Sequence, residues 1–213
     1  LSLNARRGLL VFGGEQGFAG AFSARMVSAA ASEGKGTALL LVGSRGISAA
    51  EERRLHVDWG VPMAARIEGI PKLANRIVET IYQRITASKL DAVELLVPHQ
   101  ETGQPARIER VQLYPLPLIP LSSPKGCYPP LLTLSPILLA ERLVEEYVYA
   151  RICAAALQAF TAENLARLET MAGARLHVGR MLEELGRERN QVRQGEITSE
   201  IIELASADPA EAP

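Results

Sequence analysis

Aromatic residues and net charge are both scarce in this chain of 213 residues. Phe, Trp and Tyr together make up 5% of it, and the formal net charge at pH 7 is −1. So few rings leave little material for stacking nucleic-acid bases, and a chain without excess positive charge has no general attraction for phosphate backbones or anionic lipid. We therefore expect no nucleic-acid partner.

Cysteines and long apolar runs are scarce as well. The only cysteines are Cys127 and Cys153, too few for a disulfide scaffold and typical of a reducing compartment. No apolar run approaches the roughly 20 residues that a membrane-spanning helix needs. Hydrophobic residues nevertheless make up 47% of the chain, which is enough for one buried core, or for one domain with an extended element.

Strand and helix patterns alternate through the first half of the chain. Apolar runs at residues 8–13 and 38–43 end in glycine and are typical of buried parallel strands, while 92–98 and 107–116 predict two more strands joined by a turn. One helix is predicted over residues 17–34, and a second begins near Pro71. Their apolar faces are Phe18, Phe22, Met26 and Ala29 in the first, and Leu73, Ile77, Ile81 and Ile85 in the second. This alternation predicts an open, Rossmann-like α/β sheet.

Proline then marks a change of organisation, with seven prolines between residues 114 and 136. Because proline fixes φ and removes hydrogen-bond donors, this stretch predicts an extended connector. We divide the chain into a globular foot at 1–134, which includes the connector, a long helix at 135–207 and a tail at 208–213. The segment PLIP in the connector could also be a proline-rich ligand, but a covalent bridge is the simpler interpretation.

The long helix is predicted to begin with Ser135 as its cap and Pro136 in its first turn. Its first third is broadly apolar, which suits packing on a sheet, at Leu138, Leu139, Leu143, Val144, Tyr147, Val148 and Ile152. Beyond Thr161 the apolar residues narrow to a coiled-coil seam. The seam consists of Leu165, Leu168, Ala172, Val178, Leu182, Leu185 and Val192, with Arg189 filling one gap. An isolated helix orders poorly, so the residues after Thr161 should fray, bend or pair with a second copy unless a partner helix covers them.

A glycine-rich stretch, GGEQGFAG at residues 13–20, raises the possibility of a phosphate site. No choice among its glycines gives the G-x-G-x-x-G spacing of dinucleotide-binding proteins, and Lys35 lacks the context of a P-loop. We therefore favour a tight strand-to-helix turn.

No catalytic, metal or cofactor constellation is evident. His56, His99 and His177 fall in three different elements without ligand spacing, and Ser44 lacks the surroundings of a nucleophile elbow. The paired carboxylates are neighbours on solvated helix faces. We predict a non-catalytic protein.

The segment GRERNQVRQGEITSEIIELASA, residues 186–207, resembles the C-terminal helix of the gamma subunit of F-type ATP synthases. That family ends in a pattern of the form N-x-x-R-Q-x-x-I-T-x-E-[IL], matched here by Asn190, Arg193, Gln194, Ile197, Thr198, Glu200 and Ile201. Three upstream segments also resemble segments of the family and occur in the same order along the chain: GLLVFGGEQGFAGAF (8–22), LLVGSRG (40–46) and AENLARLETMAG (162–173). Glu15 and Gln16 replace the family's Asp-Arg, Ala19 its Cys and Ala172 its Lys, which indicates a divergent member.

The resemblance implies a central-stalk subunit. Its foot would bind no nucleotide and would sit on the membrane rotor ring and the epsilon subunit, while a coiled coil rises into the catalytic head. The long helix would form half of an antiparallel coil with an N-terminal helix that is missing here. By resemblance, Arg193 and Gln194 are expected to bind the alpha and beta subunits, with Asn190, Thr198 and Glu200 as further candidates. The location implied is the cytoplasmic side of a bacterial inner membrane, as a peripheral subunit.

Two other functions stay open at the level of sequence. A small Rossmann-like nucleotide-binding enzyme with a helical oligomerisation arm would be stabilised by nucleotide, by about 2.7 kcal/mol at a hundredfold excess over the dissociation constant. A helical adaptor would use PLIP and the seam.

Overall fold

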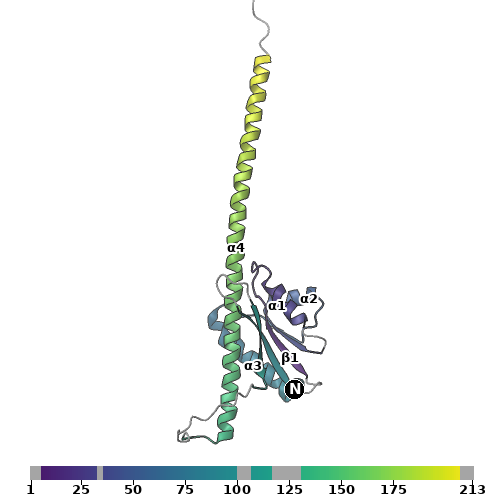
Figure 1. The fold of residues 1–213 in the computed structure, drawn as a ribbon, viewed down its shortest axis with the longest axis vertical. Coiled ribbons are helices and arrows are strands. Elements are labelled where there is room, and N and C mark those ends of the chain that lie inside the picture. The colour runs from purple at the N-terminus through teal and green to yellow at the C-terminus, as the bar shows by residue number, and fades with distance from the viewer. Residues whose placement is uncertain (1–5, 33–35, 100–106, 117–130, 207–213) are drawn as a thin grey trace, which may run out of the picture. The chain divides into compact units, whose positions relative to one another are not determined.

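The computed structural model describes residues 6–32, 36–99, 107–116 and 131–206 (Figure 1). The chain divides into two compact units, residues 1–168 and 169–213. The first contains the sheet and its helices. The second contains the rest of the long helix.

A five-stranded sheet forms the centre of the first unit, with the strand order β3-β2-β1-β4-β5. The strands are β1 (Arg7–Phe12), β2 (Ala38–Val42), β3 (Trp59–Val61), β4 (Ala92–His99) and β5 (Arg107–Tyr114). The strands β1 to β4 run parallel to one another, and β5 runs antiparallel to β4. The four strands predicted from the sequence are confirmed. The turn predicted between the last two falls at residues 100–106, outside the described residues.

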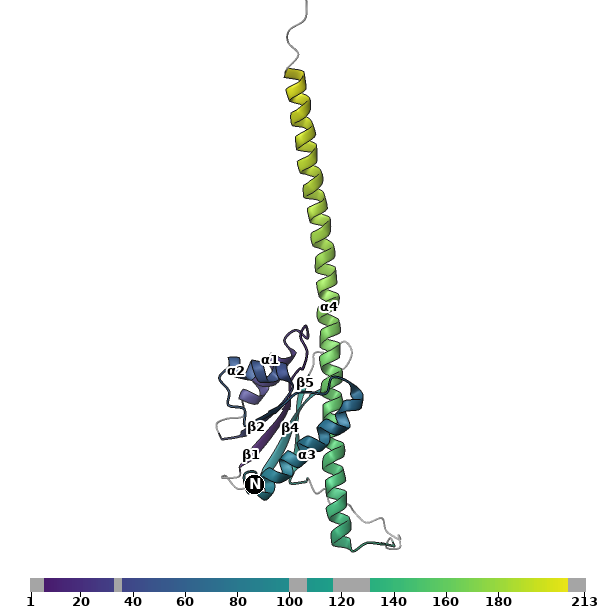
Figure 2. The same cartoon turned by 180° about the vertical axis from the view of Figure 1, so that it is seen from behind.

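Helices cover both faces of the sheet, as Figures 1 and 2 show. Along β1, Leu9 and Val11 pack with α1 (Phe22–Ala31) and α2 (Ser44–Glu52). Leu10 and Phe12 pack on the other face with α3 (Ile70–Thr86) and the first half of α4 (Pro136–Ser206). This arrangement explains the unbroken apolar runs, because a strand buried on both faces has no solvent side.

The first predicted helix is shorter than the sequence suggests. It begins at Phe22 rather than near residue 17 and ends at Ala31. Phe18 is 74% exposed and has a φ of +64°, so its assignment to the buried helix face was wrong. The glycines around it bend the chain into a turn, and the apolar spacing could not reveal this.

Two elements were not predicted at all. The helix α2 is nine residues long with Gly46 and Ala50 as its buried residues, and β3 is three residues long. Neither is long enough to display a clear period. A 3₁₀ turn, η1 (Ile67–Gly69), leads into α3, whose predicted start near Pro71 is confirmed.

The helix α4 is 71 residues long, which corresponds to about 105 Å at 1.5 Å per residue. The predicted cap is confirmed, because Ser135 Oγ accepts a hydrogen bond from the Leu138 N–H at 3.4 Å. Most of the prolines in the predicted connector fall at residues 117–130, outside the described residues. No helix among the described residues combines the length and the apolar character needed to cross a membrane.

The sheet-packing face of α4 differs from the one predicted. Leu138, Leu143 and Tyr147 are exposed, so their assignment to a broad buried face was wrong. The buried residues are Val148, Ile152, Ala155, Ala156, Ala159, Ala162 and Glu163. Four alanines in this set let the helix approach the core closely, and an apolar count that weights large side chains overlooks them. The division into a foot at 1–134 and a helix at 135–207 stays a prediction.

Candidate partner-binding site

The five residues expected to bind a partner lie in the last turns of α4, and all are exposed. Arg193 and Gln194 lie about one helical turn after Asn190, and Thr198 lies about two turns after it. These four side chains therefore share one broad face of the helix, with Glu200 at its edge. Thr198 Oγ1 donates to the Gln194 carbonyl at 2.7 Å, which restrains Thr198 against its own helix. Arg189 Nη2 donates to Asn190 Oδ1 at 3.3 Å.

Arg193 and Gln194 are available for a partner. Within the described part of the chain, neither side chain forms a hydrogen bond or an ion pair. A guanidinium presents five donors in a fixed fork that matches a carboxylate, and an amide both donates and accepts. The two groups point about 100° apart round the helix, and each is chemically suited to hydrogen-bond a polar loop on another protein.

The apolar seam of α4 is exposed in the second unit. Val178, Leu182, Leu185 and Val192 are each more than half exposed. At about 100° per residue, Gln194 lies about 160° round the helix from the middle of this seam. A partner helix that covers the seam would therefore leave Gln194 free, whereas Arg193, about 60° from the middle of the seam, would lie beside that helix.

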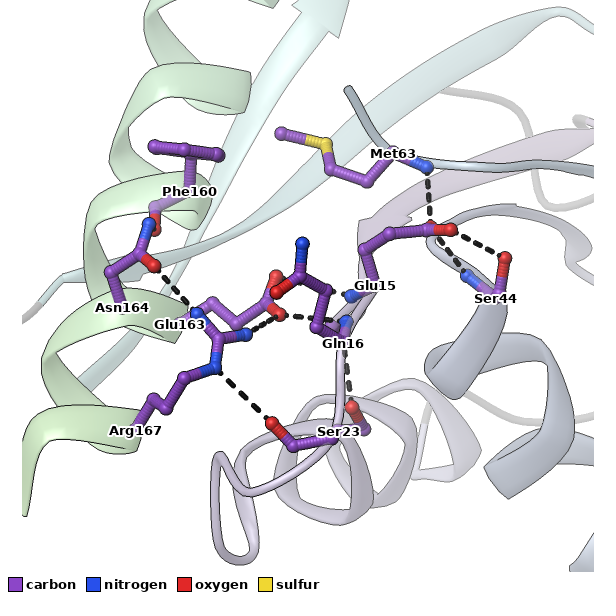
Figure 3. Close-up of polar contacts among 11 residues, drawn as sticks. Glu15, Gln16, Ser23, Ser44, Met63, Phe160, Glu163, Asn164 and Arg167 are labelled. Atoms are coloured by element: carbon purple, nitrogen blue, oxygen red, sulfur yellow. Dashed lines mark hydrogen bonds and ion pairs between the residues drawn. The ribbon is translucent and has the colours of Figure 1, made fainter. Parts of the chain in front are cut away.

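The glycine-rich stretch forms a tight turn between β1 and α1. The Gly14 N–H donates to Ser23 Oγ at 3.1 Å. The next two N–H groups, of Glu15 and Gln16, donate to the carboxylate of Glu163 on α4 at 3.1 and 2.9 Å (Figure 3). The Glu163 side chain is only 5% exposed. A carboxylate of the chain itself therefore occupies the position where a bound phosphate would accept these hydrogen bonds.

The N–H groups in the first turn of α2 are likewise hydrogen-bonded by acceptors of the protein itself. Glu15 accepts hydrogen bonds from the Ser44 N–H at 2.9 Å, the Ser44 hydroxyl at 2.8 Å and the Met63 N–H at 2.7 Å (Figure 3). The Arg45 and Gly46 N–H groups donate to the Gly14 carbonyl. The Gly43 N–H donates to the Val61 carbonyl at 2.8 Å. With Ser44, Arg45 and Gly46, all four orphan N–H groups expected at a helix start thus have partners within the protein.

Glycine is required here for close packing. A Cβ on Gly13 would lie 2.6 Å from Gly46 Cα, and one on Gly43 would lie 2.5 Å from the Gly13 carbonyl oxygen. Gly43 also has a φ of +110°, which favours glycine. These glycines bring the turn against α2, in agreement with the interpretation as a tight corner.

Arg167 completes the contact between α4 and the turn. Its Nη2 donates to Glu163 Oε1 at 2.5 Å, and its Nε donates to the Gly17 carbonyl at 3.2 Å. A third nitrogen, Nη1, donates to Asn164 Oδ1 at 2.6 Å. Glu163 and Arg167 both belong to the segment AENLARLETMAG, and nothing in that segment of the sequence connects them to the glycines. The four-residue spacing of Glu163 and Arg167 on a helix indicates that the two side chains can pair, but not that they meet the glycine-rich turn.

The histidines are not brought together by the fold. His56 is exposed and lies 3.9 Å from Asp58, whereas His99 ends β4 and His177 lies on α4. Among the described residues, no group of three or more His, Cys, Asp or Glu side chains is placed to hold a metal ion.

Comparison with known proteins gives a consistent result. A family model described as ATP synthase matches residues 2–210. The chain is 29% identical over 210 residues to the ATP synthase gamma chain of Ruminococcus albus, covering 93% of this chain and 71% of that one. It is 28% identical over 220 residues to the ATP synthase gamma chain of Streptomyces griseus, covering 96% and 72%.

Solved structures share the fold. A chain in the Euglena gracilis mitochondrial ATP synthase (OSCP/F1/c-ring) matches with a TM-score of 0.67 and 12% identity, covering 95% of this chain and 71% of that one. A chain in the Tetrahymena thermophila mitochondrial ATP synthase central stalk and c-ring matches with a TM-score of 0.57 and 15% identity, covering 82% and 79%.

A mixed sheet carrying one very long helix is therefore a fold found in ATP synthase stalk subunits. The chain belongs to the ATP synthase family, and the curated members that it resembles are gamma chains.

Proposed function

We propose that this chain is the non-catalytic rotor shaft of an F-type ATP synthase. In this function it couples ion flow through a membrane ring to ATP synthesis or hydrolysis in a catalytic head. The family match over residues 2–210 carries the proposal. The long exposed seam supports it, because such a helix needs a partner to become a stiff shaft.

The shaft works through its asymmetry. As it turns, it presents different faces to each catalytic subunit in succession and so moves their sites through different affinities for nucleotide. The seam of α4 would be covered by an antiparallel helix from the N-terminal part of the full-length protein. Arg193 and Gln194 would bind loops of the alpha and beta subunits, where the arginine can form a paired hydrogen bond to a carboxylate.

The foot would contact the membrane rotor ring and the epsilon subunit. These contacts would make the protein a peripheral component on the cytoplasmic side of a bacterial inner membrane. The buried Glu163 carboxylate in the glycine-rich turn favours this function over a nucleotide-binding enzyme, because a phosphate would have to displace it.

The experiment is co-expression of the full-length gene product with its alpha and beta subunits. We expect a complex that contains all three proteins and hydrolyses ATP, while the gamma protein alone has no activity. Failure to assemble would exclude the shaft function. Thermal unfolding of the isolated protein with ATP, ADP, NAD or NADP should show no shift, and a nucleotide-dependent shift would instead favour the enzyme.

A further inference from the structure

Glu163 and Arg167 lie where α4 leaves the sheet. Ala162 and Glu163 are the last buried residues of the helix. From Leu168 to Ser206 every residue except Gly186 is exposed. Any torque that passes between the long helix and the sheet must therefore pass through residues up to this point.

The apolar part of the contact resists rotation weakly. Val148 and Ile152 pack deeper in the core, and the two turns that lead up to Glu163 are buried through the small side chains of Ala155, Ala156, Ala159 and Ala162. Apolar contacts are not directional, so the methyl groups of these alanines do little to fix the rotation of the last two buried turns about the helix axis. Directional bonds are needed to prevent that movement.

The Glu163–Arg167 pair supplies directional hydrogen bonds, with Glu163 as the acceptor and Arg167 as the donor. Glu163 accepts from two N–H groups of the glycine-rich turn, and Arg167 donates to the Gly17 carbonyl of the same turn. The ion pair between the two side chains, at 2.5 Å, fixes each in position for its backbone partners. Such charge-assisted bonds are about twice as strong as neutral ones.

The glycine-rich turn is itself hydrogen-bonded to the rest of the sheet domain. The Gly13 N–H donates to the Val42 carbonyl at the end of β2 at 2.7 Å. Glu15 binds the Ser44 N–H at the start of α2 and the Met63 N–H after β3. The turn is thus bonded to α4 on one side, and to β2, to α2 and to the segment after β3 on the other.

We propose that Glu163 and Arg167 are positioning residues that form the torsional joint between the sheet domain and the long helix. The joint locks the helix against rotation relative to the sheet, so that turning of the foot is passed to the shaft. This inference rests on the proposed function as a rotor shaft.

The test compares variants of the full complex in inverted membrane vesicles. Two quantities are measured together: the rate of ATP hydrolysis, and the membrane potential formed, read with a voltage-sensitive dye that responds to either coupling ion. Glu163→Gln replaces one acceptor oxygen by an NH2 group, which would face the backbone N–H of either Glu15 or Gln16 without accepting from it. Arg167→Gln removes the guanidinium and leaves the Glu163 carboxylate on its backbone donors, so it reports on the joint even if Glu163→Gln does not fold.

We expect both variants to hydrolyse ATP while the potential formed per ATP hydrolysed falls severalfold. Glu52→Gln, which neutralises an exposed carboxylate on α2, should leave this ratio unchanged. Ile152→Val, which removes one methylene from the buried face of the same helix, should also leave it unchanged, because it weakens packing without loosening the pair.

An unchanged ratio in both pair variants would overturn the joint, and so would a loss of similar size in Ile152→Val. Failure of the proposed function is a separate result, because the unaltered protein would then give no complex that hydrolyses ATP.

Discussion

Gln16 donates its backbone N–H to the Glu163 carboxylate at 2.9 Å, although 147 positions separate the two residues along the chain. The contact joins the turn after the first strand to the first half of the last helix. It places an internal carboxylate where related α/β folds can hold a bound anion. The glycine-rich turn is therefore part of how the long helix is attached to the sheet.

The turn itself should not tolerate a side chain at Gly13. In Gly13→Ala the new Cβ would lie 2.6 Å from the Gly46 backbone, so we expect a loss of about 1–3 kcal/mol in the free energy of unfolding. In the control, Gly17→Ala, the new Cβ would lie 3.4 Å from the flexible end of Arg45, and stability should stay within about 1 kcal/mol of the unaltered protein. Urea unfolding measures both, and equal effects would contradict the close packing of the turn.

The core between α4 and the sheet depends on Ile152, which is fully buried. Ile152→Ala should cost about 2–5 kcal/mol through lost burial and the cavity left behind. Leu157 lies on the same helix but is 44% exposed, so Leu157→Ala should cost about 1 kcal/mol or less. A comparable cost for both, measured by urea unfolding, would show that α4 does not pack through this face.

Protection from hydrogen exchange should change sharply along α4. In the chain of 213 residues, the amides of residues 148–163 should exchange slowly, because this part of the helix packs on the core. Amides beyond about residue 170 should exchange far faster, because their side chains are exposed. In the complex with alpha and beta subunits, both regions should be protected. Slow exchange along 170–200 in a chain that is monomeric by solution mass would contradict the need for a partner helix.

The ion pair between Arg6 and Asp91 should give the sheet domain a small sensitivity to acid. Hydrogen bonds from the Arg6 side chain and N–H lower the pKa of Asp91 below its ordinary value. A carboxyl whose pKa is lowered by folding contributes stability above its unfolded pKa and loses that contribution as pH falls through the folded pKa.

The difference in melting temperature between the unaltered protein and Asp91→Asn should therefore shrink as pH falls from 7 to 3. A difference that is constant over this range would exclude the pair as its source.

The exposed face near the end of α4 should matter for activity and not for folding. Arg193→Ala combined with Gln194→Ala should leave assembly intact and lower ATP hydrolysis by the complex, because both side chains are free to bind the head. A second double variant on the same helix, Arg187→Ala with Glu188→Ala, is the control and should change hydrolysis less. Unchanged hydrolysis in the first variant would remove these two residues from the binding site.

The main strands and the long helix could be predicted from the sequence because each leaves a clear pattern. The runs that became β1, β2 and β4 are apolar throughout because both faces of these strands are buried, and this leaves a clear signal. The 71-residue helix was evident because no proline interrupts it. The short α2 and β3 gave no such signal, because nine and three residues do not reveal a period.

The hydrogen bonds of Glu163 to the glycine-rich turn could not be predicted from the sequence. Their recognition requires knowing that α4 passes the end of β1, which depends on tertiary packing rather than on any local pattern. The buried alanines of α4 were missed because a small side chain carries little weight in an apolar pattern, although it permits close approach. The terminal motif could be identified only by resemblance, since a solvated Arg-Gln pair on a helix has no distinctive pattern of its own.

Rotation of the foot in an assembled complex tests the shaft function most directly. The full-length protein, with a cysteine replacing the exposed Lys72 on α3, is assembled with alpha and beta subunits, and the head is fixed to a surface. A particle attached through this cysteine should turn in one direction when ATP is added and stop when ATP is removed. A complex that hydrolyses ATP while the attached particle does not turn would contradict a rotor shaft.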